Sequence, residues 1–219
     1  YRTEKFIYSQ TFYKSDVNMA QQEEITGATV VGLTFNDGVV IAAEKRVTLG
    51  PSLMSRGGKK LFKITNKIYI GVAGIIADMQ AISRTLSAEL KIYELTNKRE
   101  PSTKAAAKLL SNILYSNKLF PYYTSIIVGG IDSTGPHIYV LDPLGSLIED
   151  KYATLGTGAE LAISVIEGSY KESMTKEEAE NLAYKSVKLA CERDVLSGDG
   201  IDLVIITKNG AEEKFLPIK

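Results

Sequence analysis

Residues 27–33, Gly27-Ala28-Thr29-Val30-Val31-Gly32-Leu33, are the stretch from which the folded part of this 219-residue chain is predicted to start. The β-branched and apolar side chains of Thr29–Phe35 are typical of a strand, and a second such run covers Val39–Ala43. Between the two runs stands Asn36-Asp37-Gly38, a strong signal for a tight turn. The sequence therefore predicts a β-hairpin at the start of the domain.

The rest of the chain alternates strand patterns with helix patterns. Further strands are expected at Lys60–Ile64, Ile68–Ala73, Ser125–Ile131, His137–Leu141, Leu147–Glu149, Ile201–Thr207 and Glu212–Leu216. Helices are expected at Ile75–Asn97, from Pro101 onward, at Ala159–Tyr170 and at Lys176–Arg193, the last with a capping box of Thr175 and Glu178. This order predicts an α+β domain in which two antiparallel sheets pack face to face under outer helices. Neither a second domain nor an internal repeat is visible.

Composition narrows the class of protein. The chain is 44% apolar, which is enough for a substantial single core, and its 26 basic and 26 acidic residues balance. A balanced charge argues against nucleic-acid and membrane-surface partners. No apolar run approaches the ~20 residues that span a bilayer, and no secretory segment is recognisable. Cys191 is the single cysteine, so we expect a reducing, cytoplasmic location.

Residues 1–27 differ in composition from residues 28–219. They combine scattered aromatic residues with the polar run Gln21-Gln22-Glu23-Glu24 and show no helical period. We interpret 1–27 as an extended leader or propeptide and 28–219 as the domain. Met19 is a candidate start residue, which makes 1–18 an extension or an added sequence.

Several motifs beyond the first hairpin occur together in one known family. They are Glu44-Lys45-Arg46, Gly57-Gly58-Lys59-Lys60, Ala73-Gly74 and the run Arg193-Asp194-Val195-Leu196-Ser197-Gly198-Asp199-Gly200-Ile201-Asp202. With residues 27–33 they resemble the proteasome β-subunits of the archaeal type, which are N-terminal-threonine proteases. The resemblance covers about 27–215 and implies a four-layer αββα sandwich. The Ser-Gly-Asp-Gly-Ile-Asp part is the most specific motif and argues against the simpler bacterial relative.

The resemblance implies a nucleophile at residue 28, where this chain has alanine. In the family a threonine at that position attacks the carbonyl of the preceding glycine, here Gly27, and the freed α-amine then serves as general base. Ala28 has no hydroxyl, so neither self-cleavage nor catalysis is expected. Thr29 is no substitute, because a shift of one residue along a strand points a side chain to the opposite face.

The supporting residues of the family site are all present. By resemblance, Glu44 is the acid, Lys60 the lysine, Arg46 a structural arginine and Gly74 the oxyanion-hole residue. In an arbitrary protein, Glu44 and Lys60 would more often form an ordinary surface ion pair. We favour the site because Glu44 ends an apolar run and the flanking glycines fall at the family's spacing. Asp194 and Ser197 match residues that support the amine and the hydroxyl, and Thr157 stands where the family usually has serine.

A specificity pocket is implied by the same resemblance. The positions that line it are Val47, Gly58, Phe62, Val72, Ile76 and Gln80. Most are apolar, which indicates a preference for cleavage after large apolar residues. The alternative for Phe62, Val72 and Ile76 is that they are plain core residues.

Other chemistry is not expected. His137 is the only histidine, which disfavours a histidine triad or a multi-histidine metal site, and no phosphate-binding glycine loop is found. Cys191 is interpreted as a small buried residue, and Gly129-Gly130 as strand residues that permit close backbone approach. We therefore expect no cofactor and no metal.

Three functions remain open. The first is a proteolytic proteasome β-subunit kept as an inactive precursor by Ala28 in place of threonine, by engineering. The second is a naturally non-catalytic, structural β-subunit, and the third is an amidohydrolase of small amides. We favour the first, because a subunit that lost activity naturally would be expected to lose some supporting residues as well. The partners implied are other β-subunits in a heptameric ring, α-subunits, unfolded polypeptide substrates and, indirectly, an ATP-dependent unfoldase.

Overall fold

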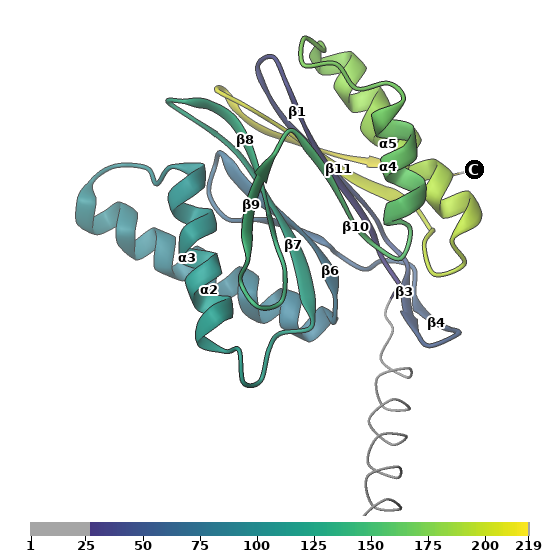
Figure 1. Ribbon diagram of the computed structural model, residues 1–219, viewed down its shortest axis with the longest axis horizontal. Coiled ribbons are helices and arrows are strands. Elements are labelled where there is room, and N and C mark those ends of the chain that lie inside the picture. Colours follow the sequence, from purple (N-terminus) through teal and green to yellow (C-terminus); the bar gives the residue numbers. More distant parts are fainter. Residues whose placement is uncertain (1–26, 219) are drawn as a thin grey trace, which may run out of the picture.

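The fold is seen in a computed structural model that describes residues 27–218. Its core consists of two five-stranded antiparallel sheets that lie face to face (Figure 1). The first sheet has the order β10-β1-β2-β11-β12, and its strands are Tyr152–Gly156, Thr29–Phe35, Gly38–Glu44, Ile201–Thr207 and Gly210–Leu216. The second has the order β5-β6-β7-β8-β9, with strands Leu61–Lys63, Ile68–Gly74, Thr124–Asp132, Gly135–Leu141 and Leu147–Asp150.

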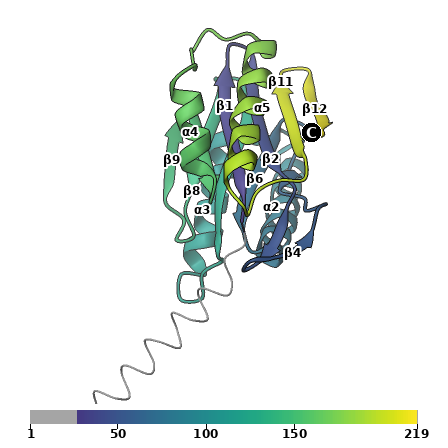
Figure 2. The ribbon, with the colours of Figure 1, turned by 90° about the vertical axis from the view of Figure 1, so that its right-hand side faces the viewer.

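Helices cover the outer face of each sheet. Figures 1 and 2 show α4 (Ala159–Glu167) and α5 (Lys176–Arg193) on one side, and α2 (Ile76–Asn97) and α3 (Thr103–Ser116) on the other. Three buried apolar clusters fill the spaces between the four layers. The expected αββα sandwich is therefore confirmed.

Alternation along β1 distributes its side chains between two of these clusters. Val31, Leu33 and Phe35 pack toward α4 and α5, whereas Ala28 and Val30 lie in the cluster between the sheets. The sheets approach closely at Gly129, where a Cβ atom would lie 2.7 Å from Cδ1 of Ile41. This bears out the expectation that the paired glycines of β7 permit close approach.

Some elements differ from the sequence prediction. The strands β3 (Val47–Leu49), β4 (Ser52–Ser55) and β10 were not predicted, because they are short and β4 is exposed along its whole length. The predicted start of α3 at Pro101 was wrong. The side chain of Ser102 accepts the N–H of Ala105 as the N-cap, so Pro101 precedes the helix.

Three further boundaries were misplaced by two or three residues. Helix α4 ends at Glu167, not at Tyr170, β8 begins at Gly135, not at His137, and β12 begins at Gly210, not at Glu212. The predictions that concern residues 1–26, the leader among them, lie outside the described residues. Within residues 27–218 no helix is long and apolar enough to cross a membrane.

The cap of α5 gives a test of the fold. The Thr175 hydroxyl accepts the N–H of Glu178, and the Glu178 carboxylate accepts the N–H of Thr175. Replacing Thr175 by alanine removes one of these bonds, and we expect the free energy of unfolding to fall by about 1 kcal/mol. Denaturant titration measures this loss, and Thr175→Ser, which keeps the hydroxyl, should lose much less. Equal losses in both variants would contradict the assigned cap.

Candidate active site

The centre of the candidate site is a buried ion pair between Lys60 and Glu44. The side chains of Lys60 and Glu44 are 1% and 0% exposed, so this is no surface pair. Lys60 Nζ donates to Glu44 Oε1, to the carbonyl of Arg46 at 2.7 Å and to the carbonyl of Gly27 at 3.3 Å. All three ammonium donors are thereby engaged.

The second carboxylate oxygen of Glu44 is held by the backbone. Its Oε2 accepts the N–H of Arg46 at 2.7 Å and the N–H of Gly198 at 2.9 Å. Burial raises the pKa of Glu44 above its ordinary value, against the opposing effect of Lys60. Burial likewise lowers the pKa of Lys60, against the opposing effect of Glu44. Burial therefore disfavours both charges, and each is supported by its partner.

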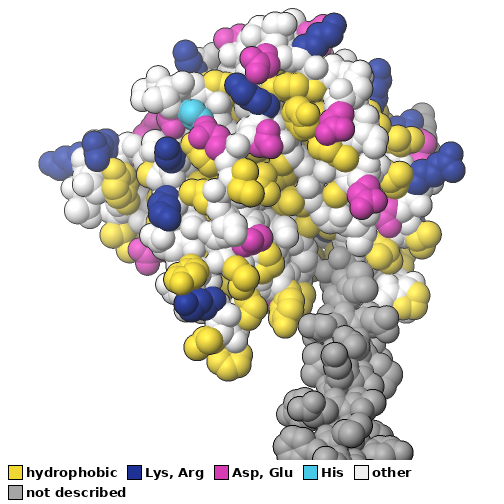
Figure 3. All heavy atoms as spheres, viewed as in Figure 1, with side chains coloured by type: hydrophobic (Ala, Val, Ile, Leu, Met, Phe, Trp, Pro, Cys, Tyr) yellow, Lys and Arg dark blue, Asp and Glu magenta, His cyan; other side chains and the backbone are white. Residues whose placement is uncertain are grey.

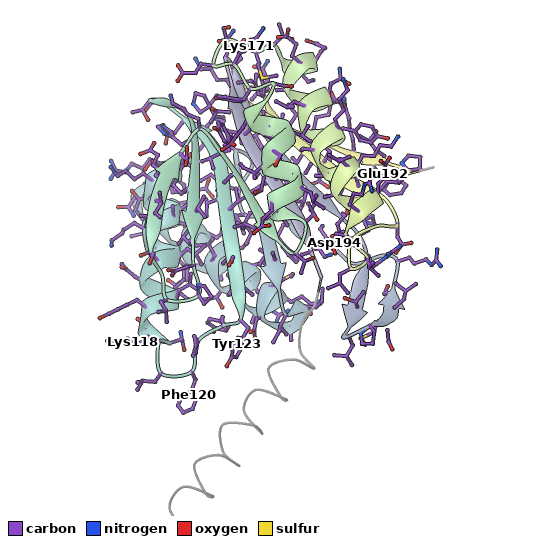
Figure 4. All side chains as sticks on the ribbon, turned by 45° about the vertical axis from the view of Figure 1, so that its right-hand side comes forward. Lys118, Phe120, Tyr123, Lys171, Glu192 and Asp194 are labelled. Atoms are coloured by element: carbon purple, nitrogen blue, oxygen red, sulfur yellow. The ribbon has the colours of Figure 1, made fainter. Side chains whose placement is uncertain are left out.

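Ala28 lies beside a second group of polar side chains. The Ala28 N–H donates to Thr157 Oγ1 at 3.3 Å, and Thr157 Oγ1 donates to Asp194 Oδ2 at 2.5 Å. Ser197 Oγ donates to the same Asp194 oxygen at 2.7 Å. The structure thus brings together Asp194 and Ser197, which the resemblance assigns to support of the amine and hydroxyl, and Thr157, which stands where the family usually has serine. Asp194 caps the end of α5, near the β3–β4 hairpin (Figure 4).

Thr29 lies on the opposite face of β1 from Ala28, as strand alternation requires. It is fully buried, and its Oγ1 lies 2.8 Å from Ser197 Oγ. A Cβ atom on Gly158, which precedes α4, would come within 2.1 Å of that Oγ1. The hydroxyl of Thr29 is therefore packed toward the helices and cannot take the place of a nucleophile at residue 28.

Arg46 ties the first sheet to the loop that follows α5. Its Nε donates to Asp199 Oδ2 at 2.8 Å, and its NH1 donates to the carbonyl of Val195 at 2.8 Å. The hydrogen bond from Arg46 lowers the pKa of Asp199. Because this loop also carries Ser197 and Gly198, Arg46 holds both groups of polar side chains in one arrangement.

The peptide of Gly27 is held by residues that sequence reasoning did not assign to the site. The Gly27 N–H donates to Thr48 Oγ1 at 3.1 Å. A Cβ atom on Gly27 would lie 2.1 Å from Leu196 Cβ and 2.5 Å from the Leu196 carbonyl oxygen. Only glycine fits at residue 27 in this arrangement. The strand signal at Thr48 was too short to be recognised, and Leu196 lies inside a family motif without any assigned role.

Gly74 ends β6, and its neighbour Ala73 lies in the same buried cluster as Ala28. Its φ angle is +138°, and a Cβ atom would lie 2.0 Å from the carbonyl oxygen of Tyr123. Any other residue would strain this corner between β6 and α2. The structure thus requires glycine here for a reason independent of any role toward substrate.

The residues expected to line a specificity pocket form two groups and one separate exposed residue. Val47 touches Gly58, where a Cβ atom would lie 2.4 Å from Val47 Cγ2. Phe62, Val72 and Ile76 share the apolar cluster beneath α2, with Val72 fully buried and the other two half-buried. Gln80 is exposed on α2. The core interpretation therefore applies to Val72 without excluding a lining role for its neighbours.

The remaining reactive side chains do not form a competing site within the described residues. Burial raises the pKa of Cys191 to about 12, so its thiol stays protonated and unreactive. His137 lies on β8, between Thr134 Oγ1 at 2.7 Å and Glu149 Oε1 at 2.8 Å. It pairs with Gly130 near the end of β7, whereas Gly74 pairs with Thr124 at the start of that strand. The Thr134 hydroxyl donates to Asp132, so this set stabilises a turn and does not activate a nucleophile.

Comparison with known proteins identifies relatives along nearly the whole chain. A family model described as proteasome subunit matches residues 25–206. Over 198 residues the chain is 51% identical to the proteasome subunit beta 2 of Pyrobaculum neutrophilum, a match that covers 90% of this chain and 98% of the relative. It is 53% identical to the proteasome subunit beta 2 of Pyrobaculum aerophilum over 90% and 96% of the two chains. The proteasome subunit beta 1 of Ignicoccus hospitalis is 51% identical over 84% and 92%.

The burial of Lys60 and Glu44 predicts how the free energy of unfolding changes when the lysine is removed. Lys60→Met leaves a buried carboxylate without a partner, and we expect the free energy of unfolding at pH 7 to fall by about 3–5 kcal/mol. The unpaired Glu44 binds a proton more tightly in the folded than in the unfolded chain. Part of the loss should therefore be recovered as the pH falls from 7 toward 5.

Denaturant titration across that pH range measures the effect. The control is the double variant Lys60→Met with Glu44→Gln, which has no charge to bury and should depend less on pH. A single variant as stable as the parent at pH 7 would mean that the pair is not buried in solution.

Proposed function

The chain belongs to the proteasome β-subunit family, whose members are generally threonine proteases, and on that premise we propose that it is an unprocessed, inactive β-subunit precursor. Ala28 occupies the nucleophile position, 1–27 is the retained leader and 28–219 is the mature domain. The observation that carries the proposal is the intact polar environment of Ala28. Two hydrogen-bonded groups, Lys60 with Glu44 and Asp194 with Thr157 and Ser197, lie around a residue that has no reactive atom.

With threonine at residue 28 the same environment supports self-cleavage. The threonine Oγ attacks the Gly27 carbonyl carbon and loses its proton as the C–O bond forms. The C–N bond to residue 28 then breaks, and its nitrogen gains a proton and becomes a free amine. Water then hydrolyses the ester, which leaves a carboxylate on Gly27 and restores the hydroxyl. Lys60, whose ammonium already donates to the Gly27 carbonyl, stabilises the charge that develops on that oxygen.

In the mature subunit the freed amine replaces the amide nitrogen as general base. The position of Thr157 Oγ1, 3.3 Å from the nitrogen of Ala28, orients that amine, and Asp194 holds Thr157. The backbone N–H of Gly74 is proposed to stabilise the oxyanion. Apolar residues around Phe62 and Ile76 favour substrates cut after large apolar side chains.

The proposed partners are other β-subunits in a heptameric ring, α-subunits on its outer side and unfolded polypeptides inside, supplied by an ATP-dependent unfoldase. Large exposed apolar side chains support such contacts, because a monomer rarely exposes them together. Leu119 and Phe120, after α3, are 82% and 91% exposed. Figure 3 shows apolar side chains gathered at the lower end of the molecule, where Figure 4 places Phe120.

The alternative is a naturally non-catalytic, structural β-subunit, which the absence of a hydroxyl at Ala28 favours by itself. The genomic codon for residue 28 distinguishes the two directly. A threonine codon supports the precursor, and an alanine codon supports the structural subunit.

Restoring the nucleophile tests the proposal. Ala28→Thr should give cleavage after Gly27 and hydrolysis of peptides after large apolar residues, whereas the parent chain keeps its leader and has negligible activity. Mass spectrometry of the assembled protein and a fluorogenic peptide assay measure both. Ala28→Ser is the matched control that also supplies a hydroxyl, and Ala28→Val supplies none. An intact leader and no turnover in Ala28→Thr would contradict the precursor.

The assembly is tested separately. Co-expressed with its α-subunit, the chain should form a large particle, and light scattering gives its mass. A chain that stays monomeric in the presence of the α-subunit would contradict the ring.

A further inference from the structure

Gly27 is contacted by three residues, and two of them, Thr48 and Leu196, are outside the set of residues assigned to the family site. Lys60 donates to its carbonyl at 3.3 Å, and Leu196 closes the space beside its Cα. Its N–H donates to Thr48 Oγ1 at 3.1 Å. These contacts hold the N–H and the carbonyl of Gly27, so they set the direction from which residue 28 meets that carbonyl.

Thr48 is built into the fold in a way that aims its side chain. It is 3% exposed, and it lies on β3 opposite Leu53 of β4. The register of this hairpin shifts between Val47 and Thr48, a bulge of the kind that redirects a side chain out of the regular alternation. Thr48 is the one buried residue of the strands of this hairpin, and its hydroxyl accepts the N–H of Gly27.

The hydrogen bond from the Gly27 N–H to the Thr48 hydroxyl is specific to the leader. A residue with a Cβ atom cannot occupy the Gly27 position, because that atom would lie 2.5 Å from the Leu196 carbonyl oxygen and 2.9 Å from its carbonyl carbon. These are backbone atoms, so no change of rotamer relieves the overlap. A substrate residue that carries a side chain must therefore place its backbone elsewhere, where its N–H does not meet Thr48 in the same way.

We propose that Thr48 is a positioning residue for cleavage of the Gly27–residue 28 bond, and that it is dispensable for hydrolysis of other peptides. The inference rests on the proposed function. Its hydroxyl orients Gly27 while the threonine Oγ at residue 28 adds to the Gly27 carbonyl and the C–N bond breaks. Once water has hydrolysed the ester and the leader has left, the hydroxyl has no further part in the reaction.

The test compares processing with turnover. In the full chain carrying Ala28→Thr, assembled with its α-subunits, Thr48→Val should slow loss of the leader about tenfold, as expected for one lost hydrogen bond. Intact mass spectrometry over time measures the rate. Thr48→Ser, which keeps the hydroxyl, should restore it. The matched control is Thr103→Val, because the buried Thr103 hydroxyl has no hydrogen-bond partner among the described residues.

A second measurement separates positioning from folding. In a second form of the Ala28→Thr chain, a fusion partner replaces the leader, and an added protease removes it just before residue 28. The threonine then becomes N-terminal without self-cleavage. There Thr48→Val should leave kcat and KM for a peptide substrate unchanged. Equal processing rates with and without the Thr48 hydroxyl would overturn the inference, and so would an equal loss of kcat in the bypassed enzyme. If Ala28→Thr alone never sheds its leader, the proposed function fails instead.

Discussion

The burial of one ion pair determines how the candidate site is built. The side chains of Lys60 and Glu44 are almost fully buried, so each of their hydrogen-bond donors and acceptors needs a partner within the protein. Those partners are the backbones of Gly27, Arg46 and Gly198, which come from three separate parts of the chain. The need to satisfy two buried charges therefore joins the start of β1, the end of β2 and the loop after α5 at one point.

The same constraint links structure to function. The ammonium of Lys60 reaches the carbonyl of Gly27, and the nitrogen of Ala28 reaches Thr157, so the two sides of one peptide bond are held by different polar groups. An environment of this kind is costly to bury and unnecessary for a strand that only packs. Its presence around an alanine supports the proposal that the site acts on this bond when residue 28 carries a hydroxyl.

The main strands and helices could be predicted from the sequence because they contain apolar residues at regular spacing and are bounded by turn motifs. The hairpin of β3 and β4 could not, since both strands are short and Ser52–Ser55 is exposed, and the contact of Thr48 with Gly27 joins residues far apart in the sequence. Glu44 and Lys60 were recognised through family resemblance, and their burial became visible only in the fold. The closeness of Leu196 to Gly27 has no sequence signal, because it depends on packing between residues that are far apart in the chain.

An experimental density map of the assembled particle tests the central claim most directly, at the bond between Gly27 and Ala28. We predict continuous density through this bond, with Lys60 Nζ within hydrogen-bond distance of both the Gly27 carbonyl oxygen and the Glu44 carboxylate. A chain that begins at Ala28 with a free amine, or a Lys60 side chain directed into solvent away from Glu44, would contradict it.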